Sequence, residues 1–419
     1  MANKVNIGSA SMKQIVNELG KLNWGRRAYA VVVLCATTAV ALPAQTQGGT
    51  ENVDVAYKFA VLYTFTGGAD GSGPYSSVVR DSAGSLYGTT CCGGSANGVV
   101  YKVDTAGQET VLYTFTGGAD GSNPIAVIRG PAGALYGTTY SGGEPGSCYG
   151  RGCGVVFKVS TSGHETVLYS FTGGADGGTP LAGVIGDSAG NLYGTTSQGG
   201  DLSCYVIGCG VVFEVGTSSQ ETVLYTFTGL NVGTDGGFPN AVIRDSAGNL
   251  YGTTGGGPNY GVVYKLDTLG NYTVLYSFTG GADGGGPEAG VIRDSAGNLY
   301  GTTYGGGSGG VVYKVDTSGQ ETVLYSFTGG ADGGGPEAGV IRDSAGNLYG
   351  TTYGGGSGQG EVYKVDTSGH ETVLHTFTGG ADGGHPAAGL IRGGAGNLFG
   401  TASSGGKYGA GVVFELKPQ

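Results

Sequence analysis

The sequence predicts an all-β protein, a seven-bladed β-propeller of four-stranded antiparallel blades that is closed by its N-terminal repeat strand. Three observations lead to this prediction. The motif VLY-[TS]-FTG occurs seven times, with His in place of Tyr in the last copy. The copies recur every 49 to 56 residues, and each period holds four short runs rich in Val, Tyr, Phe and Thr, which are typical of strands. Four short strands per repeat are the content of one propeller blade.

The unit that begins at Pro287 shows the order of elements. We expect strands over residues 288–294, 299–303, 311–316 and 321–328. Tight turns rich in Ser, Gly and Asn join strands one and two and strands three and four. Glycine-rich loops join strands two and three and lead into the next unit. These two kinds of loop should share one side of the ring, the loop face, and the tight turns should form the opposite side, the turn face.

Prolines mark where each unit starts. A strand start tolerates the missing N–H of proline. Residues 61–66 precede the first of these prolines, whereas the last unit stops at residues 412–416, one strand short. We therefore expect residues 61–66 to supply the fourth strand of the last blade, which removes exposed sheet edges. The seven prolines are Pro74, Pro124, Pro180, Pro239, Pro287, Pro336 and Pro386.

The N-terminus lies outside the repeats. Residues 1–44 have a basic lead, an apolar run over residues 28–42 and a cleavage site after Ala44, which indicates a signal peptide. The apolar run is short for a membrane span. We expect a linker over 45–57, the propeller over 58–419, and a secreted or periplasmic monomer with no membrane span in the mature chain.

Charge excludes one class of partner. The chain carries a net charge of −11, and removal of residues 1–44 would leave 15 basic and 30 acidic residues, a net charge of −15. An acidic surface repels phosphate backbones, so we expect no nucleic acid partner.

The repeat motifs FTGGADG, DSAGNLYGTT and GVVYKVD resemble those of the GloVer tandem-repeat family of exported bacterial proteins, over residues 58–419. The resemblance implies export and a propeller-like array of repeats. It implies no particular reaction and supplies no catalytic residues.

An aspartate recurs in the GGADG loop. Its carboxylate could bind calcium together with loop carbonyls, or it could cap its own glycine loop. One carboxylate per loop is few for calcium, so we expect no cofactor and keep calcium as the alternative. The residues are Asp70, Asp120, Asp176, Asp283, Asp332 and Asp382, with Asp235 in the fourth copy.

An arginine recurs in strand one. These side chains could hold an anion near the axis, or each could pair with a nearby carboxylate as part of the scaffold, which we favour. Gly186 stands in this place in the third unit. The arginines are Arg80, Arg129, Arg244, Arg293, Arg342 and Arg392.

The cysteines do not follow the repeat. Six lie beyond the leader, all in the loops between strands two and three of the first three blades. We expect disulfides between Cys148 and Cys153 and between Cys204 and Cys209. Cys91 and Cys92 could join each other or another loop. A zinc site of four cysteines is the alternative for the spaced pairs.

Departures from the repeat gather on the loop face, which is the expected contact surface. The candidate binding residues are Tyr149, Arg151, Asp201, Tyr205, Asn231, Asp235, Tyr260 and His385. Loop tyrosines, including Tyr140, could stack on a sugar ring or cover glycine loops. We expect a non-catalytic binding propeller for an extracellular glycan or protein. The alternative is a propeller hydrolase or lyase with carboxylates at the mouth of the channel, with or without calcium.

Overall fold

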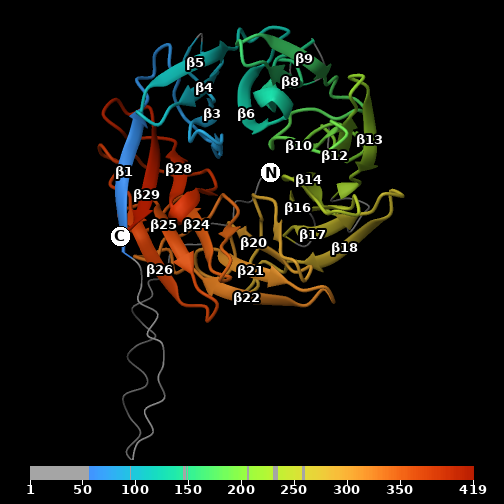
Figure 1. The fold of residues 1–419 in the computed structure, drawn as a ribbon. Helices are drawn as coiled ribbons and strands as arrows, with labels where there is room; N and C mark the ends of the chain where they lie inside the picture. Colours follow the sequence, from blue (N-terminus) through green and yellow to red (C-terminus); the bar gives the residue numbers. More distant parts are fainter. Residues whose placement is uncertain are drawn as a thin grey trace, which may run out of the picture. The chain divides into compact units, whose positions relative to one another are not determined.

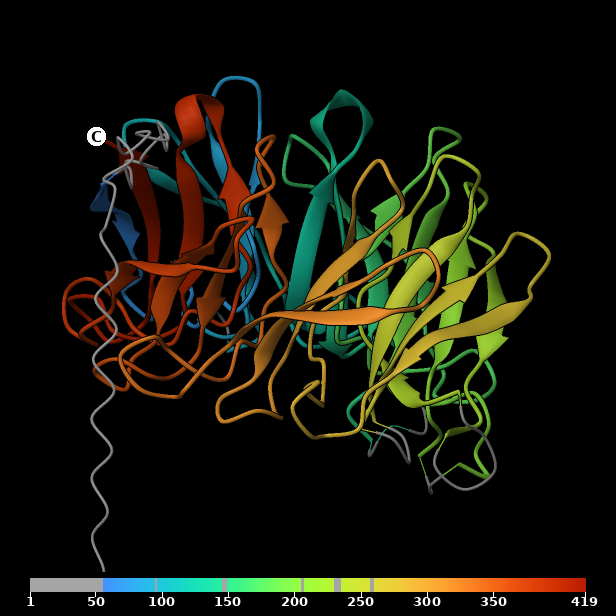
Figure 2. The same cartoon turned by 90° about the horizontal axis from the view of Figure 1, so that it is seen from below.

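A computed structural model describes residues 56–94, 96–144, 148, 150–204, 207–229, 235–256 and 260–419. Within these residues, seven antiparallel sheets form a ring of blades (Figure 1). Viewed from the side, the connections between strands gather on two opposite faces (Figure 2). The seven-bladed propeller is thereby confirmed. The expected signal peptide and nearly all of the linker lie outside the described residues. Among the described residues, no helix has both the length and the apolar character needed to cross a membrane.

The strands follow the chain from the axis outward in blades one to six, whereas in blade seven the outermost strand, β1, comes first in the chain. Blade one holds β2 (Val79–Arg80), β3 (Leu86–Thr90), β4 (Val99–Val103) and β5 (Glu109–Thr114). Blade two holds β6 (Ser122–Arg129), β7 (Leu135–Ser141), β8 (Val155–Val159) and β9 (Glu165–Ser170). Blade three holds β10 (Ile185–Gly186), β11 (Leu192–Thr196), β12 (Val211–Val215) and β13 (Glu221–Thr226). Blade four holds β14 (Gly237–Pro239), β15 (Ile243–Arg244), β16 (Leu250–Gly256), β17 (Val262–Leu266) and β18 (Tyr272–Ser277).

The later blades repeat this plan. Blade five holds β19 (Ile292–Arg293), β20 (Leu299–Thr303), β21 (Val311–Val315) and β22 (Glu321–Ser326). Blade six holds β23 (Ile341–Arg342), β24 (Leu348–Thr352), β25 (Glu361–Val365) and β26 (Glu371–Thr376). Blade seven holds β27 (Ile391–Arg392), β28 (Leu398–Ala402), β29 (Val412–Pro418) and β1 (Tyr57–Thr64). Two short 3-10 turns occupy Pro131–Gly133 and Gly394–Gly396.

The inner strands are shorter than predicted, except in blade two, where β6 spans Ser122–Arg129. In blade five only Ile292–Arg293 pairs with β20, whereas the sequence suggested a strand over 288–294. The segment just before this strand also contacts the neighbouring blade through a backbone carbonyl. Thr253 of blade four donates its hydroxyl to the carbonyl of Ala289 at 2.7 Å. The first threonine of the LYGT motif makes this bond at every joint, through Thr89, Thr138, Thr195, Thr253, Thr302, Thr351 and Thr401.

Ring closure follows the prediction. Strand β1 pairs antiparallel with β29, so the first described strand becomes the outer strand of the last blade (Figure 1). Val61 lies opposite Phe414, and a bulge shifts the register between Val61 and Tyr63. The seventh sheet thereby has four strands, with β27 at its inner edge and β1 at its outer edge.

The apolar core sits between blades rather than in one centre. At each joint, the Phe that directly follows strand four packs edge-on against an aromatic ring in strand three of the next blade. Phe278 and Tyr313 are both fully buried, with ring centroids 5.0 Å apart. A Cβ at Gly301 would meet the Tyr313 ring at 2.7 Å, which explains the glycine of LYGT. The full series is Phe65–Tyr101, Phe115–Phe157, Phe171–Phe213, Phe227–Tyr264, Phe278–Tyr313, Phe327–Tyr363 and Phe377–Phe414.

Candidate functional site

The loop face is organised by the residue before each strand-one proline. This residue has a positive φ in all seven blades, and its backbone links two blades. The N–H of His385 donates to the carbonyl of Gln359 in blade six at 2.7 Å, and its carbonyl accepts from Ser403 at 3.2 Å. Glycine adopts this backbone without strain, but four blades place a larger residue there. These four are Asn123, Thr179, Phe238 and His385.

Two of these larger side chains reach the loop of the preceding blade. Asn123 donates its amide to the carbonyl of Cys91 at 2.9 Å. The ring of His385 stacks on Tyr353 with centroids 4.5 Å apart. Backbone strain at these positions therefore accompanies contacts that exist only in particular blades, so the loop face is not seven-fold symmetric.

The GGADG aspartates hold their own loops. Asp283 accepts hydrogen bonds from the Tyr276 hydroxyl at 2.9 Å, the Thr279 amide at 2.8 Å and the Thr279 hydroxyl. Although burial acts to raise the pKa of Asp283, hydrogen bonds from Thr279 and Tyr276 hold it below its usual value. Asp70, Asp120, Asp176 and Asp332 make the same three contacts, and Asp382 has the two from threonine with His375 at 3.3 Å in place of Tyr.

This pattern supports the loop-capping interpretation, because internal donors already occupy both carboxylate oxygens. Among the described residues, no group of three or more His, Cys, Asp or Glu side chains is placed to hold a metal ion. Calcium binding by these loops stays a prediction.

The cysteines pair within their own loops. Cys148 is joined to Cys153, with Cα atoms 5.2 Å apart, and Cys204 is joined to Cys209, with Cα atoms 5.6 Å apart. Cys91 and Cys92 are thiols. Burial, followed by a hydrogen bond with Cys92, raises the pKa of the Cys91 thiol to about 12.

A hollow of about 290 Å³ lies beside the first disulfide, and we call it the rim pocket. It is formed where blades two and three meet on the loop face. Tyr140, which is 41% exposed, lies in β7 directly after the LYGTT motif of blade two, and Thr179 is the strained pre-proline residue of blade three. Its lining consists of Tyr140, Ser141, Cys148, Arg151, Gly152, Thr179 and Gln198.

The other predicted site residues are scattered. Asp201 caps its own turn, where the hydroxyl and amide of Ser203 lower its pKa. Asp235 is buried and accepts hydrogen bonds from Tyr225, Thr228 and Gly229, so its carboxylate serves its loop. Tyr260 is 60% exposed and lies against Gly280. Tyr149, Tyr205 and Asn231 lie outside the described residues.

Two carboxylates near the axis were not singled out from the sequence. The residue after each strand-one proline begins the innermost segment of its blade. Glu288 and Glu337 occupy this position in blades five and six, whereas Tyr75 and Leu181 occupy it in blades one and three. Burial, followed by the charge of Glu288, raises the pKa of Glu337 to about 7. Comparison of the proline-plus-one residue across units would have shown this acidic pair.

Comparisons with known proteins bear on the fold. The sequence matches the family described as the Gloeobacter/Verrucomicrobia repeat over residues 34–254 and 203–414. A search of curated proteins finds no match.

Several solved structures are similar to this chain at low sequence identity. The extracellular domain described as belonging to a one-component system, BT4673 from B. thetaiotaomicron, has a TM-score of 0.54 at 16% identity. The alignment covers 87% of this chain and 43% of that one. The gluconolactonase XC5397 from Xanthomonas campestris has a TM-score of 0.42 at 16% identity, over 69% of this chain and 83% of that one. A luciferin-regenerating enzyme has a TM-score of 0.43 at 15% identity, over 70% and 91%.

Proposed function

The chain belongs to the Gloeobacter/Verrucomicrobia repeat family, and we propose that it is an exported, non-catalytic binding propeller whose ligand is an extracellular glycan. The observation that carries the proposal is the rim pocket, where Tyr140 and Arg151 of blade two and Gln198 of blade three border one hollow. Arg151 lies in an insertion of blade two and Gln198 occurs only in blade three, whereas the position of Tyr140 is also a tyrosine in blades five and six.

The chemistry of the rim pocket suits a sugar. A partly exposed tyrosine offers an apolar ring face with a polar tip, which can stack against a pyranose. The Arg151 guanidinium and the Gln198 amide are directional donors for hydroxyl or carboxylate oxygens. The volume, about 290 Å³, is near the lower limit of about 300 Å³ for small-molecule sites, which suits one sugar unit better than a protein segment.

The disulfides support export and pocket rigidity together. Disulfides persist in oxidising compartments, so two intra-loop bridges are consistent with a secreted or periplasmic protein. Cys148 lines the rim pocket, and its bond to Cys153 fixes the loop that carries Arg151. A site held in shape before binding loses less conformational entropy when the ligand arrives.

A glycan array probed with residues 45–419 tests the proposal. We expect selective binding to glycans, and at least a tenfold loss of affinity for the strongest hit in Arg151→Ala and in Tyr140→Ala. Tyr304→Ala is the matched control, because Tyr304 holds the same repeat position in blade five and is 46% exposed. Binding to proteins but to no glycan would contradict the ligand class.

The acidic pair near the axis favours a second candidate, a hydrolase or lyase. A half-buried carboxyl with its pKa near 7 beside a second carboxylate is an arrangement that general acid–base chemistry uses. Turnover of the array hit by the wild type, lost in Glu337→Gln while binding persists, would establish this candidate in place of the non-catalytic proposal.

A further inference from the structure

The turn face carries a repeated contact between neighbouring blades. The strand-one arginine of one blade lies over the aromatic ring of the LYGT or LFGT motif in the blade before it. Arg129 lies 5.4 Å from the ring centroid of Tyr87, and the Tyr87 hydroxyl donates to Asp81 at 2.9 Å. Four further joints show the same stacking at 5.3–5.4 Å, with Arg80 on Phe399, Arg244 on Tyr193, Arg293 on Tyr251 and Arg342 on Tyr300.

At the joint between blades two and three, the LYGT tyrosine lacks both the arginine and the aspartate that contact it at the joint of blades one and two. Gly186 stands where the arginine would be, and Gly130 stands where the aspartate would be. Tyr136 remains, with the ammonium of Lys158 5.7 Å from its ring centroid. Compared with the joint of blades one and two, this joint lacks the positive charge of an arginine and the negative charge of an aspartate. Neither replacement glycine offers a charged partner to Lys158.

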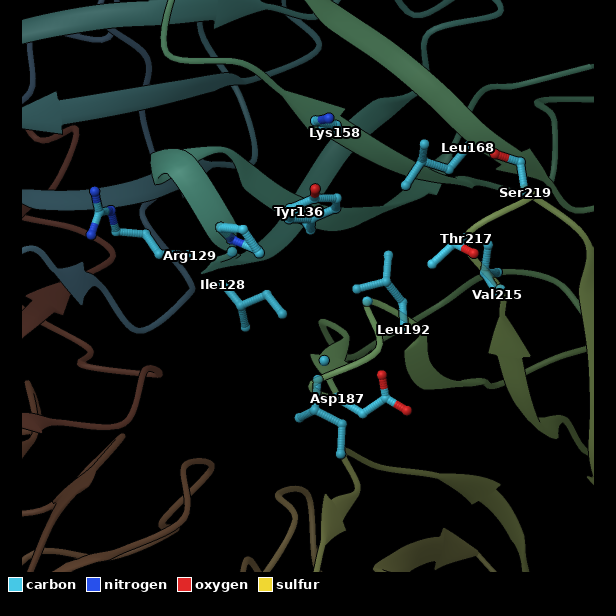
Figure 3. Close-up of a pocket in the computed structure, with 16 residues that line it drawn as sticks. Ile128, Arg129, Tyr136, Lys158, Leu168, Asp187, Leu192, Val215, Thr217 and Ser219 are labelled. Carbon is cyan, nitrogen blue, oxygen red and sulfur yellow. The ribbon is translucent and has the colours of Figure 1, made fainter. Parts of the chain in front are cut away.

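The space left by these side chains is a pocket of about 630 Å³, which we call the joint pocket (Figure 3). This volume lies inside the range of about 300–1,000 Å³ typical of small-molecule sites. Its walls are mainly apolar and are supplied by Ile128, Tyr136, Leu168, Ile185, Leu192 and Val215. Thr217 and Ser219 add hydroxyl groups at one side.

The charged groups around the joint pocket are not equivalent. Asp187 accepts hydrogen bonds from the amides of Ala189 and Asn191, the Asn191 side chain and the Tyr193 hydroxyl, so its carboxylate is satisfied. The Arg129 guanidinium lies over Tyr87 and points away from the pocket (Figure 3). Within the described part of the chain, Lys158 forms no ion pair. Lys158 is therefore the cation open to a ligand.

We propose that the joint pocket binds a small amphipathic carboxylate, with the apolar body against Tyr136 and the aliphatic walls and the carboxylate on Lys158. A charged group among apolar walls is most stable when it is paired, and the ligand supplies the missing anion. The site is on the turn face, so it is separate from the rim pocket and from the proposed glycan.

Three probes with one body and different heads test this proposal. We expect 4-phenylbutyrate to bind the mature protein at 150 mM salt at least tenfold more tightly than 4-phenyl-1-butanol or 4-phenylbutylamine, measured by calorimetric titration. Equal affinity for the three probes, tighter binding of the amine, or no binding by any of them would overturn the proposal.

Variants locate the site. Lys158→Met should weaken phenylbutyrate binding at least tenfold and leave the alcohol within twofold, whereas Lys314→Met, the same position in blade five, should change neither. Gly186→Arg should abolish binding of all three probes and raise Tm, because it restores the arginine of the other joints. A Cβ at Gly186 would lie 3.6 Å from its nearest neighbour, Ile128, so the site accepts a side chain. Unchanged phenylbutyrate binding in Lys158→Met would overturn the assignment even if Gly186→Arg did not fold.

Discussion

The hydroxyl of Thr401 donates a hydrogen bond of 3.1 Å to the carbonyl of Ser76, across 325 residues of chain. Thr401 is fully buried and Ser76 nearly so. The equivalent bond joins every other pair of neighbouring blades, so the contact between blades seven and one is the same as the contact between blades that are consecutive in the chain. Together with the pairing of β1 and β29, this bond closes the ring between blades seven and one, which come from opposite ends of the chain.

Loss of this bond should weaken the closed ring. Thr401→Val keeps the side-chain shape but leaves the buried carbonyl of Ser76 without a donor, which costs about 1–3 kcal/mol. Urea denaturation should show that loss in the free energy of unfolding. Thr317→Val, at an exposed turn position, is the control and should stay within about 0.5 kcal/mol of the wild type. A change in Thr401→Val no larger than in the control would argue against the closing role.

The tyrosine hydroxyls differ in what they contribute. The Tyr313 hydroxyl is buried with no hydrogen-bond partner, and three other repeats carry Phe at that place, namely Phe157, Phe213 and Phe414. Tyr313→Phe should therefore leave the free energy of unfolding unchanged or raise it by up to about 1 kcal/mol. Tyr300→Phe in the same blade removes a bond to Asp294 and should lower it by about 0.5–1.5 kcal/mol. The reverse order in a denaturant titration would contradict this assignment.

Stability should fall as pH rises through neutrality. Burial, followed by the charge of a loop aspartate or a neighbouring glutamate, raises the pKa of five outer-strand glutamates to about 7, namely Glu109, Glu165, Glu221, Glu321 and Glu371. Because these values exceed the ordinary 4.5, the folded state holds more protons between about pH 4.5 and 7, and stability is lost over that window. Below it, the lowered pKa of carboxyls such as Asp283 acts in the opposite direction.

Thermal unfolding between pH 5 and 8 measures this dependence. Tm should decrease with pH in the wild type. Glu321→Gln should reduce the slope and raise Tm at pH 8, since the amide never ionises. The same substitution at the exposed Glu144 should leave the slope unchanged. A Tm that rises steadily from pH 5 to 8 would show that these glutamates are not buried as described.

Thiol chemistry should distinguish the cysteines. Under denaturing, non-reducing conditions the mature protein should titrate with two thiols, Cys91 and Cys92, because the other four cysteines are paired. In the folded protein Cys91 should react slowly, since burial raises its pKa to about 12. A count of zero thiols would indicate a bond between Cys91 and Cys92, and a count of six thiols would contradict both disulfides.

The repeat could be recognised from the sequence, because similar strand and turn motifs occur seven times. Strand LYGTT was predicted as residues 299–303 and is observed as Leu299–Thr303. Closure by residues 61–66 followed from counting strands at the two ends. The inner strand of blade five was predicted too long, as residues 288–294, because a repeat period in the sequence does not show how far that segment pairs with β20.

The sites were harder to predict because they depend on neighbours in space. Gly186 was visible as an exception among the arginines, but the loss of Asp at Gly130 matters only because blades two and three meet there. Arg151 was proposed for its place in an insertion, whereas its partners Thr179 and Gln198 lie in the next blade. Asp235 looked similar in the sequence, yet burial and four hydrogen bonds give its carboxylate a structural role.

Hydrogen-exchange mass spectrometry on the mature chain, with and without the glycan selected by the array, would locate binding directly. Backbone amides around Tyr140, Arg151 and Gln198 should exchange more slowly when the glycan is present, and those of blades five and six should not change. Slower exchange confined to the segments around Glu288 and Glu337 would contradict glycan binding at the rim pocket.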